Sequence, residues 1–157
     1  MKNRGFWGEA VRQAALGGGL LCLWVALAGA QTLTVSGSPS AMKITSATAG
    51  LPPNDATNTA TTYSAKTNNK NQPKKITAAL NSAMPAGMTL TVDLVAPSGA
   101  VDDGVVTLDA TAREVVGNIT NTNTFTGQIS YALSASPAAG VVLSQSRIVT
   151  FTLTSWP

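Results

Sequence analysis

Apolar and polar residues alternate one by one along much of this chain, which is the pattern of strands with one buried face. The alternation is clearest in Met88–Leu94, where every second residue is apolar and the residues between are Thr or Asp. The abundance of Thr and Val in such segments suits a pleated sheet and disfavours helix. Alternation predicts strands at 32–36, 42–44, 76–80, 88–94, 125–133 and 149–153.

Turn signals separate these segments. Pro combined with Gly or Asn occurs at 51–55, 84–87, 96–99 and 136–140, and such combinations favour turns and loops. Strands at this spacing, with turns rather than helices between them, predict an all-β fold, an antiparallel immunoglobulin-like or jelly-roll-like β-sandwich. The one helix candidate, 110–116, is short and fits a strand or a bulge equally well.

One face of three strands is expected to form the core, because residues spaced by two point to the same side of a sheet. These strands are expected to be neighbouring and central, and their inward residues are Leu90, Val92, Ile129, Tyr131, Phe151 and Leu153.

The segment 54–75 breaks the pattern, being rich in Asn, Thr and Lys with Tyr63 as its only large apolar residue. It predicts a long exposed excursion with one weak strand around 61–65. Four lysines gather in its second half, at Lys66, Lys70, Lys74 and Lys75. They are either a solvated loop or a patch for an anionic polymer.

The first thirty residues have the three regions of a cleaved signal peptide. A basic leader precedes an uncharged, mostly apolar run, and the run ends in the small residues Ala28-Gly29-Ala30. As an uncleaved membrane anchor the run is short, and Gly17-Gly18-Gly19 weakens it as a helix. We therefore expect a signal peptide at 1–30 and one domain at 31–157. The mature protein would begin at Gln31 and reach the cell surface, the periplasm or the extracellular space.

Charge and residue content exclude several functions for the predicted mature chain. Seven basic and six acidic residues follow residue 30, so the domain is not basic enough to indicate a nucleic-acid partner. No second long apolar run follows, so no membrane span is expected there. The chain has no His, and its single cysteine, Cys22, lies in the leader. Nucleophile systems that need a His base, and zinc sites, are therefore not expected.

Asp102, Asp103 and Asp109 form the only carboxylate cluster. Oxygen ligands around Gly104 would suit calcium, but the pattern lacks the spacing of an EF-hand loop and fits a solvated hairpin turn as well. Calcium is the only cofactor that the sequence suggests. Paired carboxylates could also serve a glycosidase, but the chain is small and poor in the aromatic residues that line sugar clefts. We expect no catalytic residues, and hence no enzyme.

Both ends of the predicted mature chain are alternating strands. In exported filament subunits, an N-terminal strand of this kind can complete the sheet of the next subunit, and Leu33 and Val35 would then be the apolar anchors of an assembly strand. In its Thr-, Ala- and Val-rich texture and its order of strands and turns, the chain resembles the secreted, cysteine-free β-sandwich subunits of bacterial surface filaments and fimbriae. It departs from the chaperone–usher class, which often has a disulfide and a penultimate Tyr, because it ends in Trp156-Pro157.

These features predict an exported, non-enzymatic structural or adhesive cell-surface protein that assembles as a filament subunit by strand addition. Its expected partners are further copies of itself or other surface proteins. The alternative is a monomeric secreted β-sandwich module that binds carbohydrate or calcium through 66–75 or 102–109.

Overall fold

The computed structural model describes residues 31–48, 51–68 and 70–157, and it is an all-β protein. The predicted signal peptide, with Ala28 and Ala30 at its cleavage site, lies outside the described residues. One turn of 3₁₀ helix at Pro137–Ala139 is the only helical element in the described part. The strands are β1 (Thr32–Ser36), β2 (Ala56–Lys66), β3 (Lys74–Leu80), β4 (Met88–Leu94), β5 (Val101–Asp102), β6 (Val106–Thr107), β7 (Arg113–Ile119), β8 (Phe125–Ala135) and β9 (Val149–Ser155).

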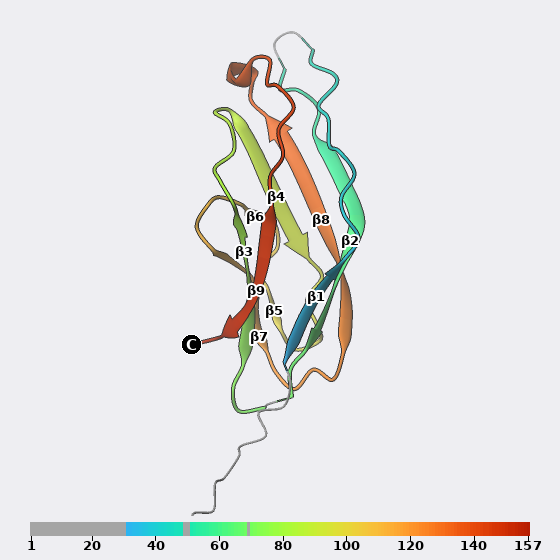
Figure 1. Ribbon diagram of the computed structural model, residues 1–157, viewed down its shortest axis with the longest axis vertical. Coiled ribbons are helices and arrows are strands. Elements are labelled where there is room, and N and C mark those ends of the chain that lie inside the picture. The colour runs from blue at the N-terminus through green and yellow to red at the C-terminus, as the bar shows by residue number, and fades with distance from the viewer. Residues whose placement is uncertain (1–30, 49–50, 69) are drawn as a thin grey trace, which may run out of the picture.

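The strands form two antiparallel sheets (Figure 1). One sheet has the order β1-β2-β8-β4-β6 and the other has the order β5-β7-β3-β9. From β2 onward, each strand lies in the opposite sheet from the strand before it. The pairing of β1 with β2 is therefore the only one between consecutive strands, and β1 is the only strand that lies outside this alternating order.

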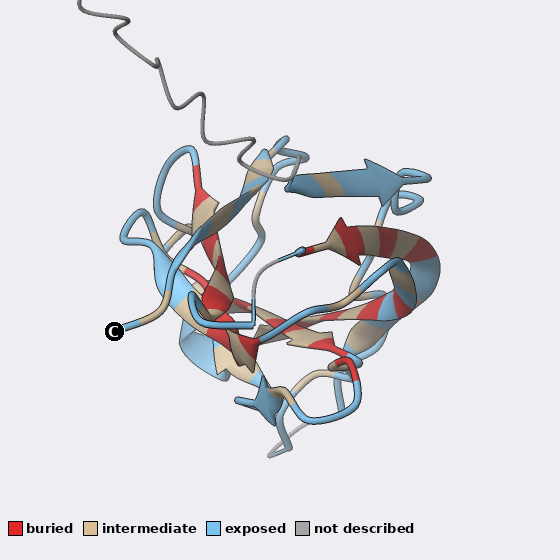
Figure 2. Cartoon of the chain, turned by 90° about the horizontal axis from the view of Figure 1, so that it is seen from below, coloured by how far each residue is buried: buried red, intermediate tan, exposed pale blue. Residues whose placement is uncertain are grey.

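A single hydrophobic core is shared by the two sheets. Figure 2 shows buried and less buried residues alternating along the strands, as one inward and one outward face require. Leu90, Val92, Ile129 and Tyr131 are buried on the adjacent strands β4 and β8, as the alternation predicts. They meet a second set of buried residues on β3 and β7: Ile76, Ala78, Leu80, Val115, Val116 and Ile119.

Phe151 and Leu153 differ from the prediction, because β9 is an edge strand rather than a central one. Both side chains pack against the core but are only half-buried. A strand with a neighbour on one side alone leaves its inward residues partly open to solvent.

Two other predictions need correction. The segment 42–44 is not a strand; Met42 and Ile44 lie in the irregular connection 37–55 between β1 and β2 and are half-buried there. The segment 54–75 is not a long exposed excursion, because half of it forms the eleven-residue strand β2, which inserts between β1 and β8. Its inward residues Thr61, Tyr63 and Ala65 are buried.

The helix candidate at 110–116 is resolved in favour of a strand with a bulge. β7 begins at Arg113, and its pairing with β3 shifts register between Ile76 and Thr77, which face Val116 and Glu114 respectively. The extra residue, Val115, is left without a partner, so both Val115 and Val116 can be buried.

Candidate functional site: the seam between β1 and β9

β1 and β9 are the edge strands on the same side of the two sheets, and they lie next to each other (Figure 1). A groove of about 420 Å³ runs between them. We call this groove the seam. Its walls and floor include Leu33, Val35, Thr61, Tyr131, Val149 and Phe151.

The register of β1 on β2 explains why Leu33 and Val35 face the seam. Leu33 lies opposite Ala65 and Val35 lies opposite Tyr63, and both partners are buried inward residues. Directly opposed residues on antiparallel strands point to the same face, so Leu33 and Val35 point inward too. Leu33 is nevertheless only half-buried and Val35 is 43% exposed. The two predicted anchors of the assembly strand thus lie together on one face, incompletely covered.

The chain leaves β1 through a position that requires glycine. Gly37 has a φ of +84°, and a Cβ atom there would come within 2.9 Å of the carbonyl oxygen of Ala60. A side chain would therefore be strained by both the backbone conformation and this contact. The segment that follows, 37–55, contains no strand in its described residues, and most of them are exposed.

Some of the polar side chains buried beneath β1 have hydrogen-bond partners and one does not. The hydroxyl of Tyr63 donates a hydrogen bond of 2.6 Å to the carbonyl oxygen of Val95. Burial raises the pKa of Tyr63 well above its usual value and raises the pKa of Tyr131 to about 12. Thr61 Oγ1 is buried without a hydrogen-bond partner, alone among the described side chains, and such a group typically costs about 1–3 kcal/mol. Hydrogen bonding of buried side chains is therefore less complete below the seam than in the rest of the interior.

β9, the opposite wall, pairs along all seven of its residues with β3. Its other edge has no strand partner in the described structure. The end of β9 is fastened by side chains as well. Lys74 Nζ donates to Ser155 Oγ (3.1 Å), and the Trp156 indole N–H donates to Glu114 Oε1 (2.8 Å).

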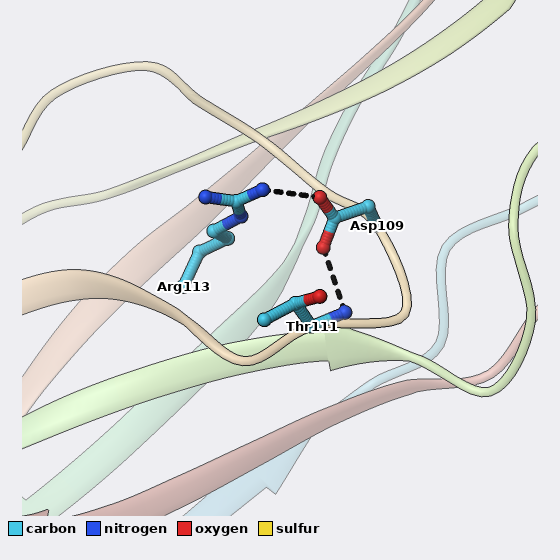
Figure 3. Close-up of polar contacts among 3 residues, drawn as sticks. All are labelled: Asp109, Thr111 and Arg113. Carbon is cyan, nitrogen blue, oxygen red and sulfur yellow. Dashed lines mark hydrogen bonds and ion pairs between the residues drawn. The ribbon is translucent and has the colours of Figure 1, made fainter.

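Two of the three aspartates of the acidic cluster, Asp102 and Asp109, have separate local roles. Asp102 Oδ1 accepts a hydrogen bond of 2.7 Å from the Gly104 backbone N–H, as in a tight turn. Asp109 accepts hydrogen bonds from the Arg113 guanidinium and the Thr111 backbone N–H (Figure 3). The Arg113 hydrogen bond is the largest cause that lowers the pKa of Asp109, whereas desolvation, followed by the charges of Glu114 and Asp102, raises the pKa of Asp103. No group of three or more metal-ligating side chains occurs in the described residues.

The lysines of 66–75 are also dispersed. Lys74 is buried, and Lys75 Nζ forms an ion pair of 3.1 Å with Glu114 Oε2. Lys66 is half-buried at the end of β2, and Lys70 is exposed. They do not form one solvated patch, because three of the four belong to the strands β2 and β3, where Lys74 is buried and Lys75 is paired with Glu114.

Residues on β9 and β8 complete the seam, and sequence reasoning did not place them there. Phe151 and Tyr131 were predicted to face inward, and Val149 lies in the predicted strand 149–153. Their position beside β1 depends on which strands are neighbours, and no local pattern gives that information.

Comparisons of the chain with models of protein families, with curated proteins and with solved structures find no match. The helical part of the described structure is too short to provide an apolar helix that could cross a membrane.

Proposed function

We propose that this chain is an exported, non-enzymatic structural or adhesive subunit of the cell surface, which assembles by exchanging β1 between copies. In this proposal the domain is an immunoglobulin-like or jelly-roll-like β-sandwich, in keeping with its two antiparallel sheets. The exported location rests on the leader sequence, and the non-enzymatic character rests on the lack of His and, after residue 30, of Cys.

The observation that carries the proposal is that few side chains of β1 pack against the core. Its inward face contributes only the half-buried Leu33 and the largely exposed Val35, so most of its attachment is main-chain pairing with β2. The same pairing can be made with the β2 edge of another copy, where strand addition would restore every hydrogen bond. Exchange therefore costs little at β1 itself, and its main cost is the rearrangement of the connection, whose Met42 and Ile44 pack against the core.

The chain order supports the same mechanism. β1 is outside the alternation between sheets that connects β2 to β9, so it can leave without disturbing that order. The irregular connection 37–55 gives it the length to reach a neighbour. Each copy would donate one strand and accept one, and such a head-to-tail contact continues into a filament unless it closes into a ring or a dimer.

The first test is removal of residues 31–36. We expect the variant to lose oligomers in size-exclusion chromatography and filaments in electron microscopy, and to retain a folded or partly open monomer by circular dichroism. If β1 pairs only within its own domain, the deletion should instead lower thermal stability without changing the oligomeric state.

A finer test compares Leu33→Asp with Thr34→Asp. The first places an unpaired carboxylate on the inward face, which should cost several kcal/mol where the strand is accepted and block assembly. The second adds the same charge to the exposed outer face of the same strand and should assemble much better. A wild-type protein that stays monomeric at every concentration would contradict the proposal and favour the monomeric ligand-binding module.

Export has its own test. The intact mass of protein recovered outside the cytoplasm should match residues 31–157, since Ala28-Gly29-Ala30 is the expected cleavage signal. A full-length mass in that fraction would contradict cleavage.

A further inference from the structure

A second and larger cavity lies at the end of the molecule that is uppermost in Figure 1, where the connections 37–55, 81–87 and 136–148 come together. It is an open cleft of about 1160 Å³. Its volume is slightly above the range of about 300–1,000 Å³ that is typical of ligand pockets. We call it the loop cleft.

The apolar lining of the loop cleft packs against the core but is richer in methionine. Met42, Met84 and Met88 all line it, and they are all the methionines that follow residue 30. The buried core described above contains no Met. Unbranched thioether side chains adapt to varied apolar shapes and are favoured at adaptable binding surfaces. Their concentration here, above the core residue Leu133 and beside the 81% exposed Leu143, indicates a surface suited to a flexible apolar chain.

The charge of the loop cleft has one sign. Arg147 and Lys43 line it, and no Asp or Glu is among the described residues that do so. Arg147 is half-buried, and its guanidinium donates only to neutral oxygens: Nε to Ala83 O (3.1 Å) and the two terminal nitrogens to Ser146 O (2.9 Å) and Gln145 Oε1 (2.7 Å). No carboxylate forms an ion pair with it within the described part of the chain. These three bonds leave an N–H on each terminal nitrogen for a further acceptor.

We infer that the loop cleft binds an anionic single-chain amphiphile, with the carboxylate or other anionic head group at Arg147 and the alkyl chain along the three methionines. The guanidinium matches a carboxylate in charge and in planar geometry, and it is already held in place by its bonds to Ala83 and Gln145. An apolar wall together with cationic groups and no carboxylate selects both features of such a ligand.

The test uses isothermal titration calorimetry on protein produced from the full chain, with decanoate and decyltrimethylammonium as probes below their micelle concentrations. Because the two probes have alkyl chains of similar length and opposite head-group charge, their difference measures the contribution of charge. We expect decanoate to bind about tenfold or more tightly than the cation, as one charge-assisted hydrogen-bonded pair would give. No binding of decanoate, or equal affinity for the two probes, would overturn the inference.

Variants locate the site. Arg147→Gln should remove most of the preference for decanoate, and Arg147→Lys should retain part of it. Arg113→Gln serves as the control, because it removes an exposed Arg that is paired with Asp109 away from the cleft. Met84→Ser should weaken both probes about equally. A preference that is unchanged in Arg147→Gln, or lost equally in Arg113→Gln, would contradict this placement of the head group.

The source of the amphiphile is distinguished by a vesicle assay. The cleft is concave and can enclose one chain, so the free monomer is the expected ligand. The protein should therefore sediment only weakly with phosphatidylglycerol vesicles. Decanoate should bind to the protein in the absence of any bilayer. Strong sedimentation with vesicles combined with no binding of free decanoate would show a membrane-docking surface instead and overturn the proposal.

Discussion

β1 and β9 both form sheet edges on the same side of the molecule, yet they are held in different ways. β9 directs Val149, Phe151 and Leu153 into the core, and the residues at its end are hydrogen-bonded to Lys74 and Glu114. β1 has five residues, of which only Leu33 is half-buried and the rest are exposed. Packing and side-chain bonds thus fix one strand, whereas main-chain pairing alone holds most of the other.

The contrast matters because both strands leave an edge free. Native proteins usually protect such edges with charges, Pro or bulges. The outward residues of β9 are Thr150, Thr152 and Thr154, and those of β1 are Thr and Ser. Neither strand has a charged outward residue. Of these two edge strands, only β1 can detach at small cost, so we assign the exchange to β1.

The largest expected difference is between two truncations. Removal of 149–157 should abolish cooperative folding, because it uncovers β3 and takes three apolar side chains from a core whose net stability is typically about 5–15 kcal/mol. Removal of 31–36 should leave a cooperative transition. Thermal unfolding followed by circular dichroism measures both, and equal loss of folding in the two variants would remove the distinction between the strands.

Single substitutions sharpen the same comparison. Phe151→Ala should lower the free energy of unfolding by about 2–3 kcal/mol, less than the roughly 3–5 kcal/mol of a fully buried aromatic, since it is half-buried. Val35→Ala, at a position 43% exposed, should cost less than about 1 kcal/mol. Urea titrations of both variants give the values, and a larger cost at Val35 than at Phe151 would contradict the assignment.

Alkaline pH should loosen the side of the core that β1 covers. Tyr63 lies opposite Val35, and burial raises the pKa of Tyr131 to about 12 and shifts that of Tyr63 in the same direction. A group whose pKa is raised on folding adds stability that is complete below its unfolded pKa of about 10 and is lost as the pH rises toward its folded pKa.

Between pH 10 and 12, the free energy of unfolding should therefore fall by about 1.4 kcal/mol per pH unit for each tyrosine that remains protonated in the fold. Tyr131→Phe should reduce that slope, as measured by urea titrations at several pH values. An unchanged slope in Tyr131→Phe would show that this hydroxyl is not the group that titrates.

The smallest predicted effect concerns the fastening of β9. Trp156→Phe keeps an aromatic ring but removes the indole N–H that donates to Glu114, so the free energy of unfolding should fall by about 1 kcal/mol. Thr34→Val, on the exposed face of β1, should change it by less than about 0.5 kcal/mol. A loss at Thr34 that exceeds the loss at Trp156 would indicate that β1 is the better-anchored strand.

Strand positions could be predicted where large apolar residues occupy every second position. β3, β4, β8 and β9 follow the pattern closely, and the all-β fold is confirmed. β2 was largely missed because two of its inward residues, Thr61 and Ala65, are polar or small. The pair Met42 and Ile44 imitates a strand because residues spaced by two also suit the wall of an irregular cleft.

The site could be predicted only in part. Leu33 and Val35 were identified from their spacing near the predicted mature N-terminus, but their neighbours across the seam were not, because strands alternate between sheets and pairing partners are distant in sequence. The roles of the aspartates had a local signal. Arg113 stands four residues after Asp109, close enough in sequence for a turn to bring the two together in the ion pair that occupies this carboxylate.

The central claim, exchange of β1, is tested most directly by a disulfide across the β1–β2 pair. Thr34 and Ser64 lie directly opposite each other with both side chains on the outer face. Directly opposed Cα atoms are about 4.5–5.5 Å apart, within the range of about 4.4–6.8 Å for a disulfide. No other cysteine follows residue 30, so Thr34→Cys/Ser64→Cys reports on this pair alone.

The measurement oxidises a mixture of ¹⁴N- and ¹⁵N-labelled double-cysteine protein at high concentration and maps the disulfide by mass spectrometry and on non-reducing gels. Exchange predicts a ladder of covalent oligomers that collapses on reduction, with 34–64 disulfides joining light and heavy copies. The single variant Thr34→Cys should give dimers at most. Disulfides found only within single copies, in every oligomeric fraction, would contradict the exchange of β1.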